Sequence, residues 1–391
     1  MRFIIYCTSF LLIIIFSCSE AICQEKDITI GKVVQIQSSV LKESRKIQIA
    51  LPAGYSLSGV AYPVIYLLDG DAHFQHVTGI ISFLSAQKLI PPCIVVGIPN
   101  TSRSYNLTPV AYTDFTYTSP IYGGADQFLQ FLKQELIPFI NKQYRTNSYN
   151  ILIGHSFGGL FAVHALLTKP DIFSAYLALS PSLWWDNKKE LQNLNDFVKN
   201  NKTLPKFLYM AMGNEGDRML LPIQEFDSIL EKSAPDKFRW KYMPMPNENH
   251  GSIAHRSIYD GLEYLFSPWI YPENASNAVV RKIEKHYENI SKEFGALFSP
   301  PESVINALGY FLIGESKTNE AKAMFQYGME KFPESANFYD SMADACESVN
   351  DLVQAEINCL KAVELGTKNI DPNLVTFKQH LEFVRSKMGK K

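Results

Sequence analysis

The sequence predicts an α/β protein, with a mostly parallel sheet and helices on both of its faces, followed by an all-α C-terminal region. Short apolar runs such as PVIYLLDG (63–70) and CIVVGIPN (93–100) end at Gly, Asp or Asn, as strands covered on both faces do. Such runs alternate with helical periodicity, which is the order that builds a parallel sheet. After Pro272 the strand pattern stops and helical periodicity continues to the end.

Composition allows two domains and excludes some partners. The chain has 391 residues, of which 46% are hydrophobic and 19% charged, so it can bury a large core. Its formal net charge is −2, and it has no long run of Lys and Arg. These features argue against nucleic acid and against an anionic membrane surface as partners.

The N-terminus has the order of a secretory signal peptide, predicted over residues 1–23. Met1 and Arg2 precede an apolar run over 3–16, and small residues follow. Cleavage after Cys23 is the preferred interpretation, and it predicts a secreted or periplasmic protein. The alternative is that IFSC forms a lipobox in which Cys18 is lipidated, and only then would the protein contact a membrane.

The mature chain begins with a sheet-forming domain, predicted over 24–271. An alternating pattern over 32–52 predicts an antiparallel hairpin with Ile47, Ile49 and Leu51 on one face. The next predicted elements are helices over 77–88, over 124–144, directly after Ser156 and near 188–199, and strands over 149–154, 175–181, 206–213 and 238–245.

A linker helix is predicted within 272–300, and a helical domain over 301–391. Ala321 and Ala355 are 34 residues apart, as are Phe325 and Cys359. This period resembles tetratricopeptide repeats over 302–335 and 336–369, with 376–386 as a cap and 279–294 as a bridge to the first domain. We expect the tail either to stabilise the first domain or to bind a protein or peptide.

Ser156 lies in Gly154-His155-Ser156-Phe157-Gly158, a G-x-S-x-G pattern between a predicted strand and a predicted helix. Small residues at 154 and 158 let a strained turn close, and this turn exposes the serine Oγ. Ser156 is therefore predicted to be a nucleophile, and the alternative is a small residue in a tight turn.

A serine nucleophile needs a general base and an acid that orients it. His250 follows the last predicted strand and is the candidate base, with His255 as the alternative. Glu215 follows the strand 206–213 and is the preferred acid, with Asp217 next. Glu248 is a third possibility.

An oxyanion hole would use two backbone N–H groups. Phe157 supplies one, and the loop after the strand PVIYLL supplies the other from Gly70 or Asp71. Asp69 is either part of this loop chemistry or a structural turn residue.

Several motifs, which follow one another along the chain, resemble an esterase family of α/β-hydrolases. This family includes siderophore esterases, feruloyl esterases, S-formylglutathione hydrolases and mycolyltransferases. The segments are LPAGY, YPVIYLLDGDAHF, VVGIPNTSRSYNLTP, GHSFGGLFA, SPSLWWDN and a late HGS. The resemblance spans about residues 32–268 and implies an α/β-hydrolase fold. It implies hydrolysis of a small-molecule ester through an acyl-enzyme without a cofactor, with Ser156, His250 and Glu215 as the triad. Where the family reads R-x-R-D-L-T-P, this chain has RSYNLTP from Arg103.

The substrate side of the site is predicted from aromatic and basic residues. Trp184 and Trp185 follow a strand end and either form an aromatic wall for an acyl group or pack in the interior. Arg103 and Arg218 either contact an anionic or catechol-bearing substrate or are solvated. Siderophore and feruloyl esters are the expected classes. Acyl transfer and non-catalytic ligand binding are the alternatives.

Metal sites and disulfides are not expected. Outside the leader the cysteines are Cys93, Cys346 and Cys359, an odd number without C-x-x-C spacing, and they are predicted to be buried apolar residues. His73 and His76 have H-x-x-H spacing, but the sequence shows no third ligand.

Overall fold

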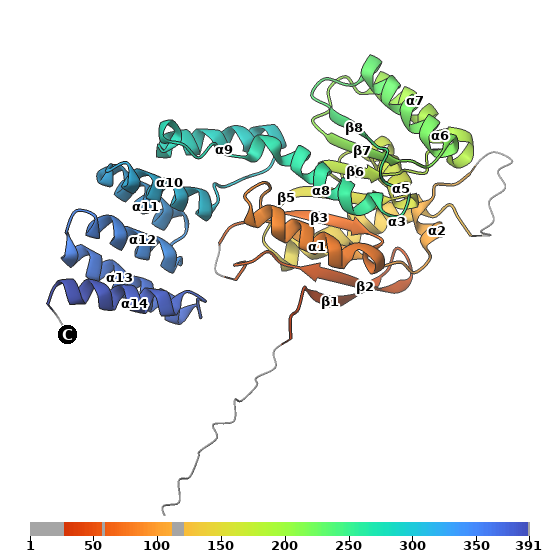
Figure 1. Cartoon of the computed structure of the whole chain (residues 1–391). Helices are drawn as coiled ribbons and strands as arrows, with labels where there is room; N and C mark the ends of the chain where they lie inside the picture. The colour runs from red at the N-terminus through yellow and green to blue at the C-terminus, as the bar shows by residue number, and fades with distance from the viewer. Residues whose placement is uncertain (1–26, 57–58, 112–120, 390–391) are drawn as a thin grey trace, which may run out of the picture.

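The computed structural model describes residues 27–56, 59–111 and 121–389. The predicted signal peptide and Cys18 lie outside the described residues. Within the described chain, a sheet with helices on both faces is followed by a stack of helices (Figure 1). This arrangement agrees with the predicted fold class.

The sheet has eight strands in the order β1-β2-β4-β3-β5-β6-β7-β8. The strands are β1 Lys32–Ser38, β2 Glu43–Ala50, β3 Tyr62–Leu68, β4 Ile94–Ile98, β5 Thr146–His155, β6 Ala175–Leu179, β7 Phe207–Gly213 and β8 Arg239–Met245. β1 and β2 pair antiparallel, as the hairpin prediction requires, and β2 runs antiparallel to β4. All the other pairs are parallel. The predicted apolar face of β2 ends at Ile49, because Leu51 lies beyond the strand and is 38% exposed.

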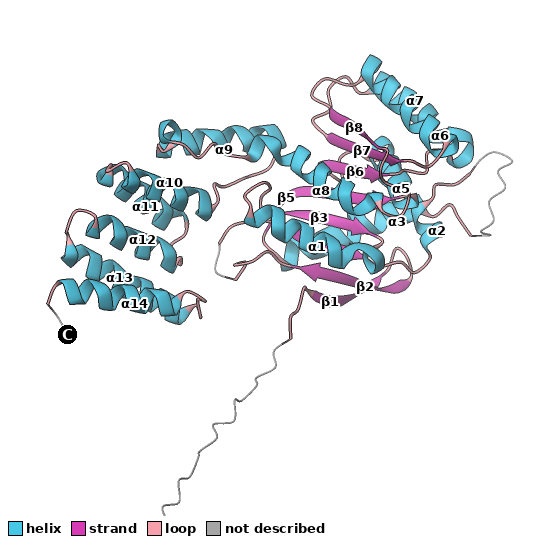
Figure 2. Ribbon diagram, in the orientation of Figure 1, coloured by secondary structure: helices cyan, strands magenta, loops and turns pink. Residues whose placement is uncertain are grey.

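Helices cover both faces of the sheet (Figure 2). α1 Gly70–Ala86 and α8 Ile253–Phe266 pack together on one face. The other face is covered by α3 Ala125–Phe131, the π-helix η1 Leu132–Leu136, α4 Ile137–Gln143, α5 Phe157–Thr168, α6 Trp185–Asn200 and α7 Asp217–Ser233. A short helix, α2 Arg103–Leu107, follows β4.

Two helices differ from their predicted bounds for local reasons. α1 begins at Gly70, seven residues earlier than predicted, because Asp69 turns the chain directly after β3 with a positive φ of 53°. The helix predicted over 124–144 contains the π-helical turn η1. Pro138 follows this turn and has no N–H to donate to the carbonyl of Gln134, which favours the wider turn.

Helices and loops make up the described part of the C-terminal region, which adds no strand to the sheet. After the 3₁₀ turns η2 Ser267–Trp269 and η3 Ala275–Asn277, its helices are α9 Val280–Phe294, α10 Glu302–Gly314, α11 Thr318–Lys331, α12 Ala336–Glu347, α13 Leu352–Lys368 and α14 Leu374–Lys387. α12 begins 34 residues after α10, and α13 begins 34 residues after α11. The period agrees with the repeat predicted from the sequence. The tetratricopeptide assignment itself stays a prediction.

The helices of the tail pack closely at glycines. A Cβ on Gly309 would lie 2.2 Å from the Phe325 ring, and a Cβ on Gly328 would lie 2.3 Å from the Phe338 ring. Any larger residue at either position would push the facing ring out of the core, so these glycines allow the helices to cross.

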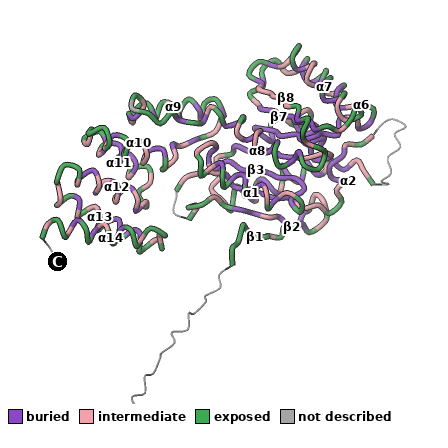
Figure 3. The backbone as a smooth tube through the Cα atoms, viewed as in Figure 1, coloured by how far each residue is buried: buried purple, intermediate pink, exposed green. Residues whose placement is uncertain are grey.

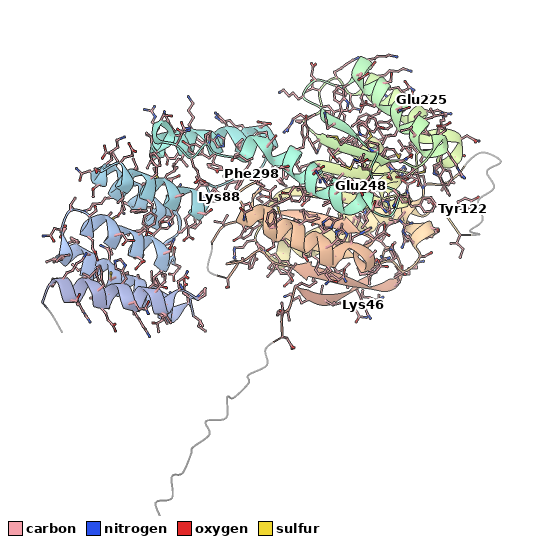
Figure 4. The ribbon with its side chains drawn as sticks, in the orientation of Figure 1. Lys46, Lys88, Tyr122, Glu225, Glu248 and Phe298 are labelled. Carbon is pink, nitrogen blue, oxygen red and sulfur yellow. The ribbon has the colours of Figure 1, made fainter. Side chains whose placement is uncertain are left out.

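One hydrophobic core extends from the sheet into the tail (Figure 3). The rings of Tyr149, Phe266, Phe294 and Phe298 lie 5.2 to 6.3 Å apart where β5 and α8 meet the end of α9. Phe298 lies where the tail joins the sheet domain (Figure 4). α9 is therefore packed against the sheet domain along a buried face.

Among the described residues, no helix combines the length and the apolar character that crossing a membrane requires.

Candidate active site

The chain turns sharply between β5 and α5 at Ser156. Ser156 has φ 61° and ψ −114°, a conformation that non-glycine residues rarely adopt. Its N–H donates to the carbonyl of Leu179 at 2.9 Å, and its carbonyl accepts from the Ser182 N–H at 3.2 Å. Both contacts come from the end of β6 and the loop that follows. The neighbouring strand thus holds the serine in its strained position at the carboxyl edge of the sheet.

The turn requires a glycine at position 154, two residues before Ser156. A Cβ on Gly154 would lie 2.1 Å from the Gly158 carbonyl oxygen, a distance that no side chain can adopt. A Cβ on Gly159 would lie 2.9 Å from Pro181 Cα, whereas Gly158 has its nearest neighbour at 3.3 Å. The tightest constraint of the G-x-S-x-G pattern is therefore at its first glycine.

A histidine and a carboxylate pair beside the turn. His250 Nδ1 hydrogen-bonds to Glu215 Oε2, and the other oxygen, Oε1, accepts from the Ser180 hydroxyl. The Glu215 side chain is only 4% exposed, whereas that of His250 is 45% exposed. If His250 donates its Nδ1 proton to this buried carboxylate, its Nε2 is left as an acceptor.

The alternative acids and base lie elsewhere. Asp217 is the exposed first residue of α7. The Glu248 side chain accepts from the Ser252 hydroxyl at 2.5 Å, and its backbone carbonyl accepts from the Asn214 N–H. His255 is on α8 and contacts His76. Of the candidates weighed from the sequence, Glu215 and His250 are therefore the two that hydrogen-bond to each other.

Candidate oxyanion donors come from two helix starts. Phe157 is the first residue of α5, and Gly70 and Asp71 begin α1. The N–H groups in the first turn of a helix face outward along its axis and carry partial positive charge. The Asp71 carboxylate accepts from Asn100 N at 3.2 Å and from Asn100 Nδ2 at 3.1 Å, so the end of β4 holds this turn.

Asp69 and Arg103 brace the serine turn. Arg103 Nε and Nη2 donate to the two carboxylate oxygens of Asp69 at 2.7 and 2.9 Å, and Nη2 also donates to the His155 carbonyl at 3.2 Å. Asp69 is 5% exposed, which agrees with the alternative of a structural turn residue. Arg103 holds the residue before the nucleophile candidate, and direct contact of Arg103 with a substrate stays a prediction.

The two tryptophans differ in exposure. Trp185 is 1% exposed, donates from Nε1 to the Pro109 carbonyl at 3.1 Å and packs on the Phe157 ring, which agrees with the interior-packing alternative. The three residues after Trp185 have positive φ values of 44° to 63°, so the chain kinks between Trp185 and the rest of α6. Trp184 is half-buried, donates to Met219 Sδ at 3.0 Å and lies under the Arg218 guanidinium, 3.9 Å from its ring centre.

Comparison with known proteins shows the family. The family described as "Putative esterase" matches residues 38–250, more than half of the chain. The chain belongs to this esterase family. The match includes Ser156, Glu215 and His250 and ends at the histidine.

Two relatives of this chain are named as esterases. The siderophore enterobactin esterase of Emericella nidulans is 35% identical over 176 residues, which are 39% of this chain and 58% of that protein. The ferri-bacillibactin esterase BesA of Bacillus subtilis is 28% identical over 233 residues, or 53% of this chain and 80% of the relative. The alignment with the first relative thus spans less than two thirds of its length.

Two solved structures share the fold. The IroE-like serine hydrolase of Shewanella oneidensis is 34% identical, with a TM-score of 0.70, and the alignment covers 77% of this chain and 99% of that chain. An uncharacterised protein of Capnocytophaga ochracea is 17% identical, with a TM-score of 0.58 and coverage of 91% and 99%. Because this second match covers 91% of the chain, the shared fold extends into the helical tail.

Five imidazoles form a row beside the site, from His250 through His155, His73 and His76 to His255. The ring centres of His250 and His155 are 4.7 Å apart, and those of His155 and His73 are 5.9 Å apart. His73 Nδ1 lies 3.0 Å from His76 Nε2, and His76 Nδ1 lies 3.2 Å from His255 Nδ1. Sequence reasoning missed this row, because its members are up to 182 positions apart.

Burial keeps the inner part of this row neutral. It lowers the pKa of both His155 and His76 to about 4, and it also lowers the pKa of His73. Neighbouring imidazoles lower the pKa values of His155 and His76 further. Within the described chain, His155 Nε2 is buried without a hydrogen-bond partner. These rings therefore present neutral imidazole to the site at pH 7.

Ser180 is a second residue that the sequence did not single out. Ser180 directly follows the last residue of β6, has a positive φ of 41° and is fully buried. The signal for Ser180 is its place at the carboxyl end of β6. This strand runs parallel to β7, and Glu215 follows the carboxyl end of β7.

The cysteines of the described chain, Cys93, Cys346 and Cys359, are free and buried, as the sequence predicted. Of the described residues in the sheet domain, no three metal-ligating side chains bring their donor atoms within 4.8 Å of one another.

Proposed function

We propose that this protein is a serine esterase in which Ser156, His250 and Glu215 form the catalytic triad. The observation that carries the proposal is the hydrogen bond between His250 and the buried carboxylate of Glu215, which also accepts from the Ser180 hydroxyl. This pair lies beside Ser156, which is held in a strained strand-to-helix turn. Membership of the esterase family supports the reaction class.

In this mechanism the Ser156 hydroxyl attacks the ester carbonyl while His250 Nε2 takes its proton. The N–H groups of Phe157 and of Asp71 stabilise the oxyanion of the tetrahedral intermediate. His250 then gives the proton to the leaving alcohol, which departs and leaves an acyl-serine. Water attacks the acyl-serine with His250 again as base, and the carboxylic acid leaves. No step requires a cofactor.

We propose siderophore esters as the substrate class. The support is that curated relatives in this family are named esterases of enterobactin and of ferri-bacillibactin. Trp184 and Arg218, stacked at 3.9 Å near the end of β6, offer an aromatic face and a positive charge to a catechol-bearing acid. Feruloyl esters share the planar aromatic acyl group and are the competing class.

The first experiment tests the nucleophile. The mature protein is exposed to a fluorophosphonate, and its intact mass is compared with that of Ser156→Ala. One covalent adduct on the wild type and none on Ser156→Ala is the expected result. The absence of an adduct on folded wild-type protein would refute the serine mechanism and favour the ligand-binding alternative.

A substrate panel then tests the class. A catecholate siderophore triester, a feruloyl ester and a simple acyl ester are compared by kcat/KM, with Trp184→Ala beside the wild type. We expect the triester to be preferred, and Trp184→Ala to reduce that preference more than it reduces turnover of the simple ester. Equal turnover of the three esters would contradict the siderophore proposal and leave the serine mechanism intact.

A further inference from the structure

Three metal-ligating side chains of different chemistry meet in the tail, far from Ser156 in the sequence. Asp340 comes from α12, Cys359 from α13 and His380 from α14, and one donor atom of each lies within 4.8 Å of the others. Cys359 is fully buried, and the side chains of Asp340 and His380 are 14% and 12% exposed. Among the described residues, this is the one group of at least three such side chains that comes together so closely.

We propose that Asp340, Cys359 and His380 bind a divalent transition metal ion of the zinc class. Thiolate, imidazole and carboxylate together form the donor set that Zn²⁺ prefers. Donors about 2.0–2.3 Å from a tetrahedral ion lie roughly 3.3–3.7 Å apart. His380 Nδ1 and Asp340 Oδ1 are 2.7 Å apart, so a small separation of these two atoms would admit the ion. Water would complete the coordination.

The second ring nitrogen of His380, Nε2, faces carboxylates, as it does in many metal-binding histidines. With Nδ1 directed at Asp340, the other nitrogen, Nε2, lies 3.2 Å from Glu347 Oε1 and 3.5 Å from Asp344 Oδ1. Glu347 is held in turn by Lys387 at 2.8 Å. Metal-binding histidines usually donate their second N–H to a carboxylate in this way, which fixes the ring and strengthens the ligand.

The local charge also favours a cation. α12 places three carboxylates, Asp340, Asp344 and Glu347, around one imidazole ring. The negative charge of these carboxylates attracts a cation to this part of the tail.

Such an ion would connect the last three helices of the chain. Each ligand comes from a different helix, and the two loops between them are short. A metal bound by the folded tail alone stabilises that fold in proportion to the logarithm of the free metal concentration. The inference does not depend on the esterase mechanism.

Cobalt(II) tests the site, because a cysteine thiolate bound to Co²⁺ gives a charge-transfer band in the near ultraviolet. The full mature chain is freed of metal with EDTA, dialysed and titrated with CoCl₂, with Zn²⁺ added last. We expect one Co²⁺ per chain with a thiolate band that Zn²⁺ removes. His73, His76 and His255 supply no sulfur, so Co²⁺ bound there would give no such band.

Variants make the assignment specific. Cys359→Ser and Cys359→Ala should abolish the band, and His380→Gln should weaken Co²⁺ binding by roughly 100-fold or more. Cys346→Ala is the matched control, because Cys346 is buried in the same small core on α12. It should keep the band. Far-ultraviolet circular dichroism and melting curves establish that each variant is folded.

Two results would overturn the site. Folded wild-type protein that gives no thiolate band would show that Cys359 holds no metal and that the cluster is only a hydrogen-bonded network. A band that survives in Cys359→Ser, or that is lost equally in Cys346→Ala, would place the metal elsewhere.

Discussion

Ser156 carries a backbone conformation that costs about 1–3 kcal/mol and persists only where its neighbours hold it. Its φ of 61° is held by Leu179 and Ser182, and Arg103 fixes the carbonyl of the residue before it. The nucleophile candidate is thus positioned by residues from two other segments. A substitution that forces the backbone of this turn to move should therefore displace Ser156.

Substitution of Gly154 by Ala tests this turn. The new Cβ would lie 2.1 Å from the Gly158 carbonyl oxygen, so we expect a loss of about 1–3 kcal/mol or more in unfolding free energy, together with reduced kcat. Gly79→Ala on α1 is the control, because a Cβ there meets no atom within 4 Å and should stabilise the helix by about 0.5–1 kcal/mol. Urea unfolding measures both. Equal effects of the two changes would contradict the steric argument.

The identity of the triad acid can be tested with two isosteric changes. Glu215→Gln should lower kcat by roughly a thousandfold or more, because the amide no longer stabilises the protonated imidazole of His250. Asp217→Asn, two residues later on the exposed start of α7, should leave kcat close to that of the wild type. A larger loss in Asp217→Asn than in Glu215→Gln would reverse the assignment.

At the scale of elements, the site forms where the carboxyl ends of parallel strands and the starts of helices meet. β5 leads into Ser156, β7 precedes Glu215, β8 precedes His250, and β3 leads into the turn at Gly70. α1 and α8, which pack together, add their histidines along the same edge. The order of strands explains why residues far apart in sequence become neighbours.

The histidine row predicts a specific dependence of stability on pH. The pKa of His76 is about 4 in the folded protein, below the ordinary value of 6.5. As the pH falls below 6.5, the unfolded chain therefore binds protons before the folded chain does, and stability is lost down to about pH 4. His76→Gln removes this group, so its stability should fall less than that of the wild type.

Urea midpoints at pH 7.5 and pH 5.0 measure this difference. At pH 7.5 the imidazole is neutral in both states, so that measurement isolates any effect of lost contacts. If the midpoints of wild type and His76→Gln fall by the same amount between the two pH values, burial of this imidazole does not limit acid stability.

At the scale of the whole molecule, one hydrophobic core is shared by the sheet domain and the first helices of the tail, α9 to α12. Phe294 and Phe298 pack on Tyr149 and Phe266, and the same core continues to the buried residues of α10 and α11. An ion pair between Lys88 and Glu273 at 2.8 Å adds a surface contact near the junction (Figure 4). This packing favours the stabilising role for the tail that the sequence left open beside partner binding.

A pair of adjacent residues tests the junction. Phe298 is 5% exposed and Leu297 is 69% exposed. Phe298→Ala should lower the unfolding free energy by about 3–5 kcal/mol through loss of packing, whereas Leu297→Ala should change it by no more than about 0.5 kcal/mol. kcat of the folded protein should be unchanged in both. A drop in kcat with normal stability would instead show that the tail acts on the site.

The element order, the turn at Ser156 and the 34-residue period of the tail could all be predicted from the sequence, because each is encoded in a short stretch by periodicity and by small residues. Contacts between distant stretches were decided only by the tertiary structure. It pairs Glu215 with His250, commits Arg103 to Asp69, buries Trp185, aligns five histidines and brings Cys359 to His380. The reason is physical: such contacts depend on strand order and helix packing, which no local pattern records.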